Sequence, residues 1–274
     1  TEKSLTTRRQ GRPQAEIMSN TAAAASAASS SSCCAPETDA ERTLRIYWRN
    51  QVEGLFDEYA ATFEDSLVHQ LGYTVPAQME ALLAREHADE HGRVSRQLAV
   101  DLGCGTGLAG AALRGRCHGR LLGCDLSAMM VAEARKKVGV YDGLEACDCV
   151  AFLRRRVEPG SADLLFAADV LIYLRDLSDL FAAAALALEP GGLFAFSTEM
   201  ATEAECRGKG WVERDSERVA HSEEYLRHAV DASGLLLRSL QLVSVRTEAH
   251  TPLQGHLCVV ERQGQGEAAN GAVN

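Results

Sequence analysis

The chain has 274 residues, a formal net charge of −10 at pH 7 and a hydrophobic fraction of 46%. This length suits one or two domains with a sizeable buried core. Even the apolar run at residues 180–188 is far shorter than the ~18 residues that a membrane helix needs, so we expect a soluble protein without membrane insertion. An acidic body does not attract a phosphate backbone over distance, and nucleic acid is therefore not an expected partner.

Residues 1–37 are dominated by Ala and Ser and lack apolar periodicity, which predicts a disordered leader. Its Arg and Ser content with few acids also suits a transit peptide for a chloroplast or mitochondrion. A leader without a targeting role fits equally well, and the cytoplasm is then the expected compartment. Residues 38–96 carry large apolar side chains at helix-like intervals, which predicts a helical cap before the first strand.

An apolar run that contains Asp101 leads directly into glycines at alternate positions, Gly103, Gly105 and Gly107. Because glycine has no Cβ, such a loop turns sharply and lets its backbone approach a ligand closely. Eighteen residues after Gly107, a second apolar run ends at Asp125, where a carboxylate is placed to accept hydrogen bonds from ribose hydroxyls. Together these features predict a nucleoside-binding β-α-β unit.

The glycines fit two kinds of nucleoside site. Gly105, Gly107 and Gly110 match the dinucleotide fingerprint G-x-G-x-x-G, with Asp125 at about the expected spacing of ~20 residues. Asp101 precedes the loop, and its negative charge would oppose a pyrophosphate but suits a cationic ligand.

Residues 100–107, Val-Asp-Leu-Gly-Cys-Gly-Thr-Gly, resemble the first motif of class I S-adenosylmethionine-dependent methyltransferases. The resemblance implies S-adenosyl-L-methionine as cofactor, with the glycine loop beside its methionine part and Asp125 at its ribose. An acid in the place of Asp148 accepts a hydrogen bond from the adenine amino group in that family, with the next backbone amide nearby, although a helix N-cap is the alternative role of Asp148. The cofactor-binding residues that this resemblance implies are Asp101, Gly103, Cys104, Gly105, Gly107, Asp125, Leu126, Asp148 and Cys149.

The order of apolar runs predicts the architecture of residues 97–262. Short strands alternate with helices and each strand ends in a polar residue, which is typical of an α/β, Rossmann-like parallel sheet with its site at the carboxyl edge. The last two runs are joined by a polar turn and predict an antiparallel hairpin, as in the class I methyltransferase sheet of seven strands. Residues 263–274 are small and polar and are predicted to be a disordered tail. The predicted strands are 97–102, 121–124, 144–147, 162–168, 193–197, 235–246 and 255–262.

Two residues are candidates for the chemistry. Asp169 follows the fourth predicted strand, where the transferred methyl group would lie, and it also counts as a cofactor-binding candidate. His221 precedes a predicted helix with Ser222 as its N-cap and is a candidate base. Glu199 and Tyr173 are weaker candidates, and a surface or capping role fits each of these residues as well.

Residues 56–64 resemble the family segment in which an aromatic residue lines a lid over the cofactor. Tyr59 and Phe63 are the candidates for that role, although a buried stripe of an ordinary core helix explains them equally well. From residue 59 to residue 262 the chain also resembles predicted methyltransferases that are sometimes joined to tetratricopeptide repeats, but no ~34-residue repeat is visible in the sequence.

The nine cysteines, an odd number, indicate reduced thiols rather than a disulfide framework. Cys147 and Cys149 alternate along the chain but bring no two further ligands, so no metal site is predicted.

The function expected from these features is methyl transfer by in-line displacement to a small molecule, through a carboxylate or hydroxyl, with a protein acceptor second. The fourth strand lacks the Asn/Asp-Pro-Pro-Tyr/Phe motif of enzymes that methylate base or glutamine amino groups. One alternative is a methyltransferase-like module that binds without turnover. The other is an NAD(P)-dependent oxidoreductase, although Tyr-x-x-x-Lys is absent at all six tyrosines.

Overall fold

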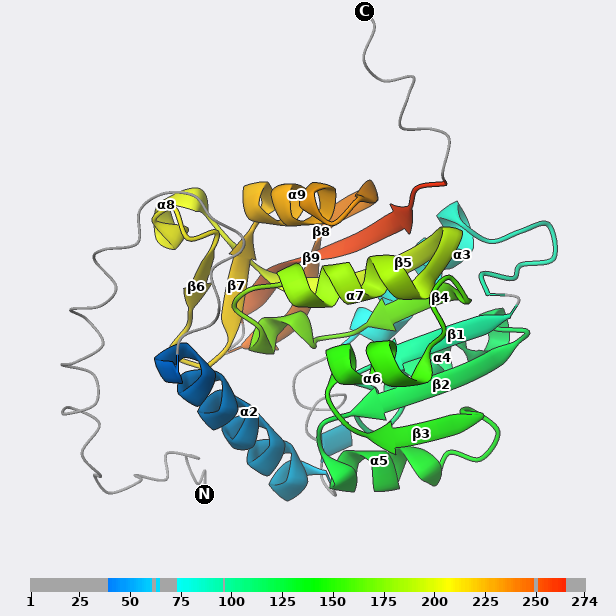
Figure 1. Ribbon diagram of the computed structural model, residues 1–274. Coiled ribbons are helices and arrows are strands. Elements are labelled where there is room, and N and C mark those ends of the chain that lie inside the picture. The colour runs from blue at the N-terminus through cyan, green and yellow to red at the C-terminus, as the bar shows by residue number, and fades with distance from the viewer. Residues whose placement is uncertain (1–38, 61–62, 65–72, 96, 249–250, 265–274) are drawn as a thin grey trace, which may run out of the picture. The chain divides into compact units, whose positions relative to one another are not determined.

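A computed structural model describes residues 39–60, 63–64, 73–95, 97–248 and 251–264 (Figure 1). The chain forms two units, residues 1–47 and 48–274. Of the first, the structure describes only the start of helix α2 (Asp39–Tyr59). The predicted leader and most of the predicted tail lie outside the described residues. Among the described helices, none combines the length and the apolar character that a membrane span needs.

The strands of the second unit form one mixed sheet with nine strands in the part of the chain that is described. Its order is β3-β2-β1-β4-β5-β7-β6, and β9 pairs with both β5 and β8. The pairs from β3 to β7 are parallel, whereas β9 runs antiparallel to β5 and β8. The expected α/β sheet with an antiparallel C-terminal hairpin is confirmed. The strands are β1 (Leu98–Leu102), β2 (Arg120–Asp125), β3 (Gly143–Ala146), β4 (Ala162–Ala167), β5 (Leu188–Ala201), β6 (Trp211–Glu213), β7 (Val219–Ser222), β8 (Leu235–Glu248) and β9 (Thr251–Arg262).

Strands β6 and β7 were not predicted from the sequence. They span three and four residues, too few to show a clear alternation of apolar and polar side chains. A second difference concerns residues 190–192, Pro-Gly-Gly, which the sequence predicts as a turn before the fifth strand. They lie within β5 instead, where the pairing with β4 shifts from Ala162 and Leu188 to Leu164 and Leu193.

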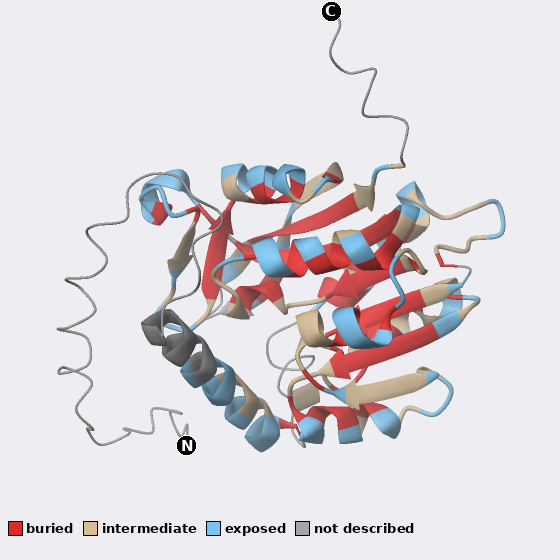
Figure 2. Cartoon of the chain, viewed as in Figure 1, coloured by how far each residue is buried: buried red, intermediate tan, exposed pale blue. Residues whose placement is uncertain are grey.

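Helices cover both faces of the sheet because successive strand residues point to opposite faces. Val100 and Phe194 pack with α6, α7 and α9 in one buried apolar cluster. Their neighbours Ala99 and Leu193 pack with α3 and α4 in the other. Figure 2 shows the central strands buried between these layers, whereas the edge strands β3 and β6 are only half-buried. The remaining elements are α3 (Val75–Glu86), α4 (Leu108–Leu113), η2 (Arg114–Arg116), α5 (Ala128–Arg135), α6 (Cys149–Arg156), η3 (Leu171–Tyr173), α7 (Ser178–Ala187), α8 (Glu203–Cys206) and α9 (Glu223–Ala232).

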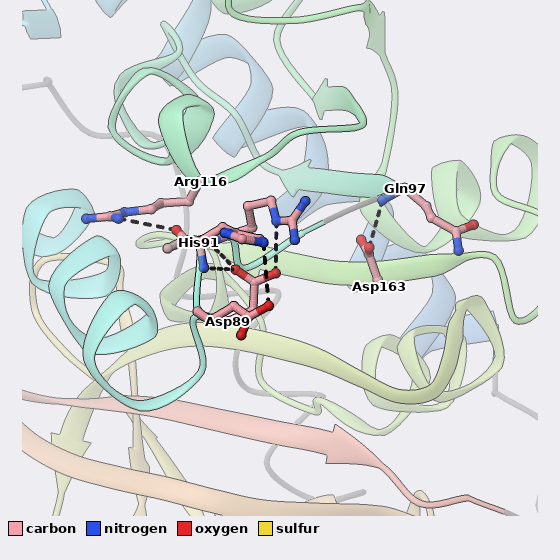
Figure 3. Close-up of polar contacts among 8 residues, drawn as sticks. Asp89, His91, Gln97, Arg116 and Asp163 are labelled. Carbon is pink, nitrogen blue, oxygen red and sulfur yellow. Dashed lines mark hydrogen bonds and ion pairs between the residues drawn. The ribbon is translucent and has the colours of Figure 1, made fainter.

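Carboxylates hold the polar segment that leads from α3 into β1 (Figure 3). Asp89 accepts hydrogen bonds from the backbone N–H groups of His91 and Arg93, both at 2.9 Å. Asp163, near the start of β4, accepts one from the backbone N–H of Gln97 at 2.8 Å. Arg116 donates to the carbonyl oxygen of Gly92 at 3.2 Å. These contacts tie the start of β1 to its neighbours, so the loop at the other end of β1 leaves from a fixed strand.

Candidate active site

The loop after β1 has a backbone that only glycine adopts easily. Gly103, Gly105 and Gly107 have φ angles of 68°, 52° and 92°, a region that costs other L-residues about 1–2 kcal/mol each. A Cβ atom on Gly103 would lie 2.3 Å from the Val170 side chain. The N–H of Cys104, which is buried, donates to the carbonyl oxygen of Cys124 at 2.8 Å and so ties the loop to β2.

Asp101 at the end of β1 is fully buried. Its Oδ2 accepts a hydrogen bond of 2.6 Å from the hydroxyl of Tyr141. Its Oδ1 has no hydrogen-bond partner among the described residues. Burial raises the pKa of Asp101 to about 7 against the opposing effect of the Tyr141 hydrogen bond, and the nearby Asp125 carboxylate adds to the rise. A cation placed beside Asp101 would stabilise its charged form.

Asp125 at the end of β2 joins the glycine loop to α5. Its Oδ2 accepts from the N–H of Gly105 and its Oδ1 from the N–H of Ser127, both at 2.9 Å. Ser127 is the predicted N-cap of α5, and its hydroxyl donates to Asp57 of α2 at 2.5 Å. Burial raises the pKa of Asp125, and these two backbone N–H groups partly oppose the rise. Each oxygen of the Asp125 carboxylate accepts a hydrogen bond from one of these two N–H groups. Each oxygen therefore keeps a second lone pair that can accept from a ligand hydroxyl.

The predicted adenine side of the site lies after β3. Asp148 caps α6, and its Oδ1 accepts from the N–H of Ala151 at 3.0 Å. Leu126 and Cys149 are half-buried. The seven described cysteines are free thiols, as the sequence predicts.

Aromatic side chains gather at the end of α2, but in a different set from the predicted one. Tyr59 is 46% exposed. Phe56 instead packs edge-on against Phe63 and Tyr173, with ring centroids 5.9 and 5.4 Å apart. A Cβ atom on Gly105 would lie 3.9 Å from the Phe63 ring, which places this group beside the glycine loop. Phe56 is one of the apolar residues at helix-like intervals in the predicted cap, but the sequence did not single it out for this role.

Asp169 after β4 has a strained backbone, with φ of 58°. The hydroxyl of Ser197 on β5 accepts a hydrogen bond from its N–H at 2.9 Å and donates one to its Oδ1 at 3.0 Å. Nη1 of Arg246 lies 3.9 Å from its Oδ2. Burial raises the pKa of Asp169, and the Arg246 charge partly opposes the rise. Ser197 and Arg246 therefore restrain both the backbone and the carboxylate of Asp169.

Sequence reasoning missed Arg246. Its side chain is only 1% exposed, and it hydrogen-bonds to Glu199 of β5 as well as facing Asp169. It comes from β8, where the pairing with β9 shifts between Ser244 and Arg246. Such a β-bulge turns a side chain to the face of the sheet opposite to the one that strand alternation predicts. No local sequence pattern indicates it.

Two tyrosines lie within the electrostatic reach of Asp169. Burial, and after it the charge of Asp169, raises the pKa of Tyr73 well above its ordinary value. Burial also raises the pKa of Tyr173, against the effect of Arg218. Both phenols are therefore protonated near pH 7, and Tyr173 belongs to the cluster that also holds Phe56.

His221 lies on β7 and is fully buried. Its Nε2 is 3.3 Å from the carbonyl oxygen of Arg175, and its ring stacks on Tyr225 at 5.7 Å. Burial lowers the pKa of His221 to about 4, so the imidazole is neutral at pH 7. Ser222 caps α9 as predicted, accepting from the N–H of Tyr225 at 3.2 Å. Within the described residues, the hydrogen-bond and ring contacts of His221 run to the Arg175 and Leu174 backbone and to Tyr225 rather than to Asp169.

Comparison with known proteins identifies the class of fold and a matching domain. Residues 100–194 match the family model of a methyltransferase domain. A solved S-adenosylmethionine-dependent methyltransferase from Leishmania major superposes with a TM-score of 0.61 at 15% identity, covering 78% of this chain and 83% of that one. The methyltransferase in a complex with the Haloferax volcanii Trm112 activator gives 0.59 at 21% identity, covering 76% of this chain and 98% of that chain. The architecture is the class I methyltransferase fold.

A curated relative agrees with this assignment. The ubiquinone biosynthesis O-methyltransferase of Burkholderia multivorans is 32% identical over 113 residues, which are 40% of this chain and 47% of the relative. The chain thus spans about half the length of the curated relatives that it matches. Residues 100–194 thus match a methyltransferase domain, within a chain that has the class I methyltransferase fold.

Proposed function

We propose that this protein transfers the methyl group of S-adenosyl-L-methionine to an oxygen atom, a hydroxyl or carboxylate, of a small molecule. The observation that carries the proposal is the fully buried Asp101, one of whose oxygens has no partner in the described part of the chain, next to three glycines in the left-handed region. In this proposal residues 38–96 form the cap and residues 97–262 the catalytic core. The name of the Burkholderia relative supports an oxygen acceptor.

The donor set fits the cofactor. Asp101 offers a buried anion to the cationic methionine part of the cofactor. The three glycines of the loop carry no side chains, so the backbone there can approach the cofactor closely. Asp125 keeps acceptor capacity for ribose hydroxyls, and the half-buried Asp148 keeps it for the adenine amino group. Cys104, Leu126 and Cys149 would line the same site. When bound, S-adenosyl-L-methionine supplies a methyl carbon on a positively charged sulfur, open to in-line displacement.

Gly110 supports this cofactor over NAD(P). It is the third glycine of the dinucleotide fingerprint, where a Cβ atom would lie 2.1 Å from the hydroxyl oxygen of Tyr141. Its missing side chain thus makes room for Tyr141 rather than for a pyrophosphate. Tyr141 in turn contacts Asp101, whose charge disfavours a phosphate.

We place Asp169 at the acceptor as the group that takes the proton of a hydroxyl. Its raised pKa makes it a stronger base than an exposed aspartate, while Ser197 and Arg246 hold it in place. A carboxylate acceptor would need no base, and positioning would then account for most of the acceleration. His221 remains the second candidate base: it is neutral at pH 7 and so can accept a proton, but its lowered pKa makes it a weaker base than an exposed histidine.

Two measurements test this function. Calorimetric titration should show binding of S-adenosylmethionine and S-adenosylhomocysteine but not of NAD, and binding of NAD alone would overturn the proposal. Purified protein with tritiated S-adenosylmethionine and a fractionated cell extract should then label a small-molecule fraction. Label in the protein fraction would point to a protein acceptor, and cofactor binding without any label would indicate a binding module.

A further inference from the structure

Tyr141 lies in a slot formed by three glycines on three different segments. A Cβ atom would lie 3.1 Å from its ring at Gly107 in the loop, 2.1 Å from its hydroxyl oxygen at Gly110 on α4, and 2.9 Å from its ring at Gly123 on β2. Contacts under 3.0 Å are not tolerated by a real Cβ atom, so side chains at Gly110 and Gly123 would displace Tyr141. The backbone around the cofactor loop is therefore shaped to admit this one phenol.

The slot directs the Tyr141 hydroxyl onto Asp101. The oxygen-to-oxygen distance of 2.6 Å is that of a short, charge-assisted hydrogen bond. Burial raises the pKa of Tyr141 well above its ordinary value, and the Asp101 charge adds to the rise. The phenol thus stays protonated and acts as the donor. A hydrogen bond to the charged form of a carboxyl group favours that form.

We propose that Tyr141 is a positioning residue, which orients Asp101 and favours its ionised form so that Oδ1 is available to the cationic methionine part of the cofactor. The inference rests on the function proposed above. It adds a residue that lies outside the glycine motif and 40 positions from Asp101 in the sequence.

The other titratable groups near Asp101 do not stabilise its negative charge as Tyr141 does. Burial raises the pKa values of Cys104, Cys117 and Tyr73 far enough to keep all three neutral near pH 7. Asp125 acts in the opposite direction, because its carboxylate disfavours the charge on Asp101. The N–H of Gly110 lowers the pKa of Asp101, as the Tyr141 hydroxyl does, but more weakly. The Tyr141 hydroxyl is thus the largest stabilising influence on the Asp101 charge among the described residues.

The test removes only the hydroxyl. Tyr141→Phe keeps the ring that fills the glycine slot, so the fold should be retained. The matched control is Tyr225→Phe, which also removes a half-buried phenol that donates to an aspartate, Asp176, at 3.2 Å. The probe is S-adenosylhomocysteine, titrated calorimetrically from pH 5.5 to pH 9 into each full-length protein.

We expect Tyr141→Phe to bind S-adenosylhomocysteine about tenfold more weakly at pH 7, as loss of a hydrogen bond to a charged group implies. The pH at which binding is half lost on acidification should move upward, because Asp101 then ionises at higher pH. Tyr225→Phe should match the wild type. In an Asp101→Asn background, adding Tyr141→Phe should have little further effect.

Three results would overturn the inference. The first is a folded Tyr141→Phe protein with wild-type affinity and pH midpoint while the wild type binds, which leaves the proposed function intact. The second is an equal loss at every pH that persists in the Asp101→Asn background, which indicates packing alone. The third is a wild type that binds neither S-adenosylmethionine nor S-adenosylhomocysteine, which removes the proposed function together with the role of Tyr141.

Discussion

Buried carboxylates are held differently in two regions, which we call the cofactor half (residues 98–156) and the acceptor half (residues 162–262). In the cofactor half, Asp101 has a neutral partner, Tyr141, and one oxygen without a partner among the described residues. In the acceptor half, Asp169 and Glu199 flank the cation Arg246. No cation of the described residues acts on Asp101, and a cationic ligand would supply one. The acceptor half is compensated internally and keeps Asp169 for proton transfer.

The halves also differ in how far apart their partners lie along the chain. Gly105 and Asp125 are 20 residues apart, within one β-α-β unit. Glu199 and Arg246 are 47 residues apart and meet only because β9 pairs with both β5 and β8. A local unit is readable as a motif, whereas a site built from paired distant strands is not.

The largest expected effect is on the rate of methyl transfer, and it distinguishes the catalytic role of the acceptor half from the binding role of the cofactor half. Asp169→Asn should lower the rate of methyl transfer to a hydroxyl acceptor about 10³-fold, within the range of general-base catalysis, while the affinity for S-adenosylhomocysteine changes less than twofold. Rates with tritiated cofactor and calorimetry measure the two effects. Asp176→Asn, an acid that contacts Tyr225 and Ser178 instead, is the control. A rate loss below tenfold would show that the acceptor reacts without losing a proton, as a carboxylate does.

The second effect concerns stability in the cofactor half. The folded-state pKa of Asp101, about 7, exceeds its ordinary value of 3.8, so its contribution to stability is fully present below about pH 4 and is lost as the pH rises to 7. Asp101→Asn should therefore raise the free energy of unfolding by about 4 kcal/mol at pH 8 and little at pH 4, at 1.36 kcal/mol per pKa unit. Urea denaturation at both pH values measures this. An equal change at both would contradict the buried, uncompensated charge.

In the acceptor half, removing a buried charge is expected to lower the free energy of unfolding, whereas removing the Asp101 charge raises it. Arg246→Met should lower the free energy of unfolding by about 3 kcal/mol, because it leaves Glu199 and Asp169 buried without their cation. Adding Glu199→Met should recover part of the loss. Denaturant unfolding at pH 7 tests both variants. A double variant less stable than Arg246→Met alone would argue against the ion pair as the cause.

The smallest effect tests the glycine loop. Gly103→Ala and Gly139→Ala both place alanine at positive φ, 68° and 81°. Only the Gly103 variant also forces a Cβ atom against Val170, because nothing lies within 4 Å at Gly139. Gly103→Ala should therefore lose about 2 kcal/mol more of unfolding free energy than its control, as measured by thermal or urea unfolding. Equal losses would show that Val170 moves aside.

Much of the cofactor half was predictable because its signals are local. Gly103, Gly105 and Gly107 stand at positions where the backbone requires positive φ, and Ser127 and Ser222 stand at helix N-caps. Tyr59 shows the limit of such signals. A helical period predicts several aromatic residues near the lid, but only the packing places Phe56, rather than Tyr59, against Phe63 and Tyr173.

The sequence by itself determined the α/β alternation, the glycine loop and the acids at the strand ends, because turn conformations and strand periodicity depend on adjacent residues. The tertiary structure alone decided that Tyr141 fills a slot between three glycines and that Arg246 reaches Glu199 and Asp169. Both depend on contacts between distant segments, and in the case of Arg246 on a β-bulge. No local pattern encodes such contacts, because they arise only once the sheet has assembled.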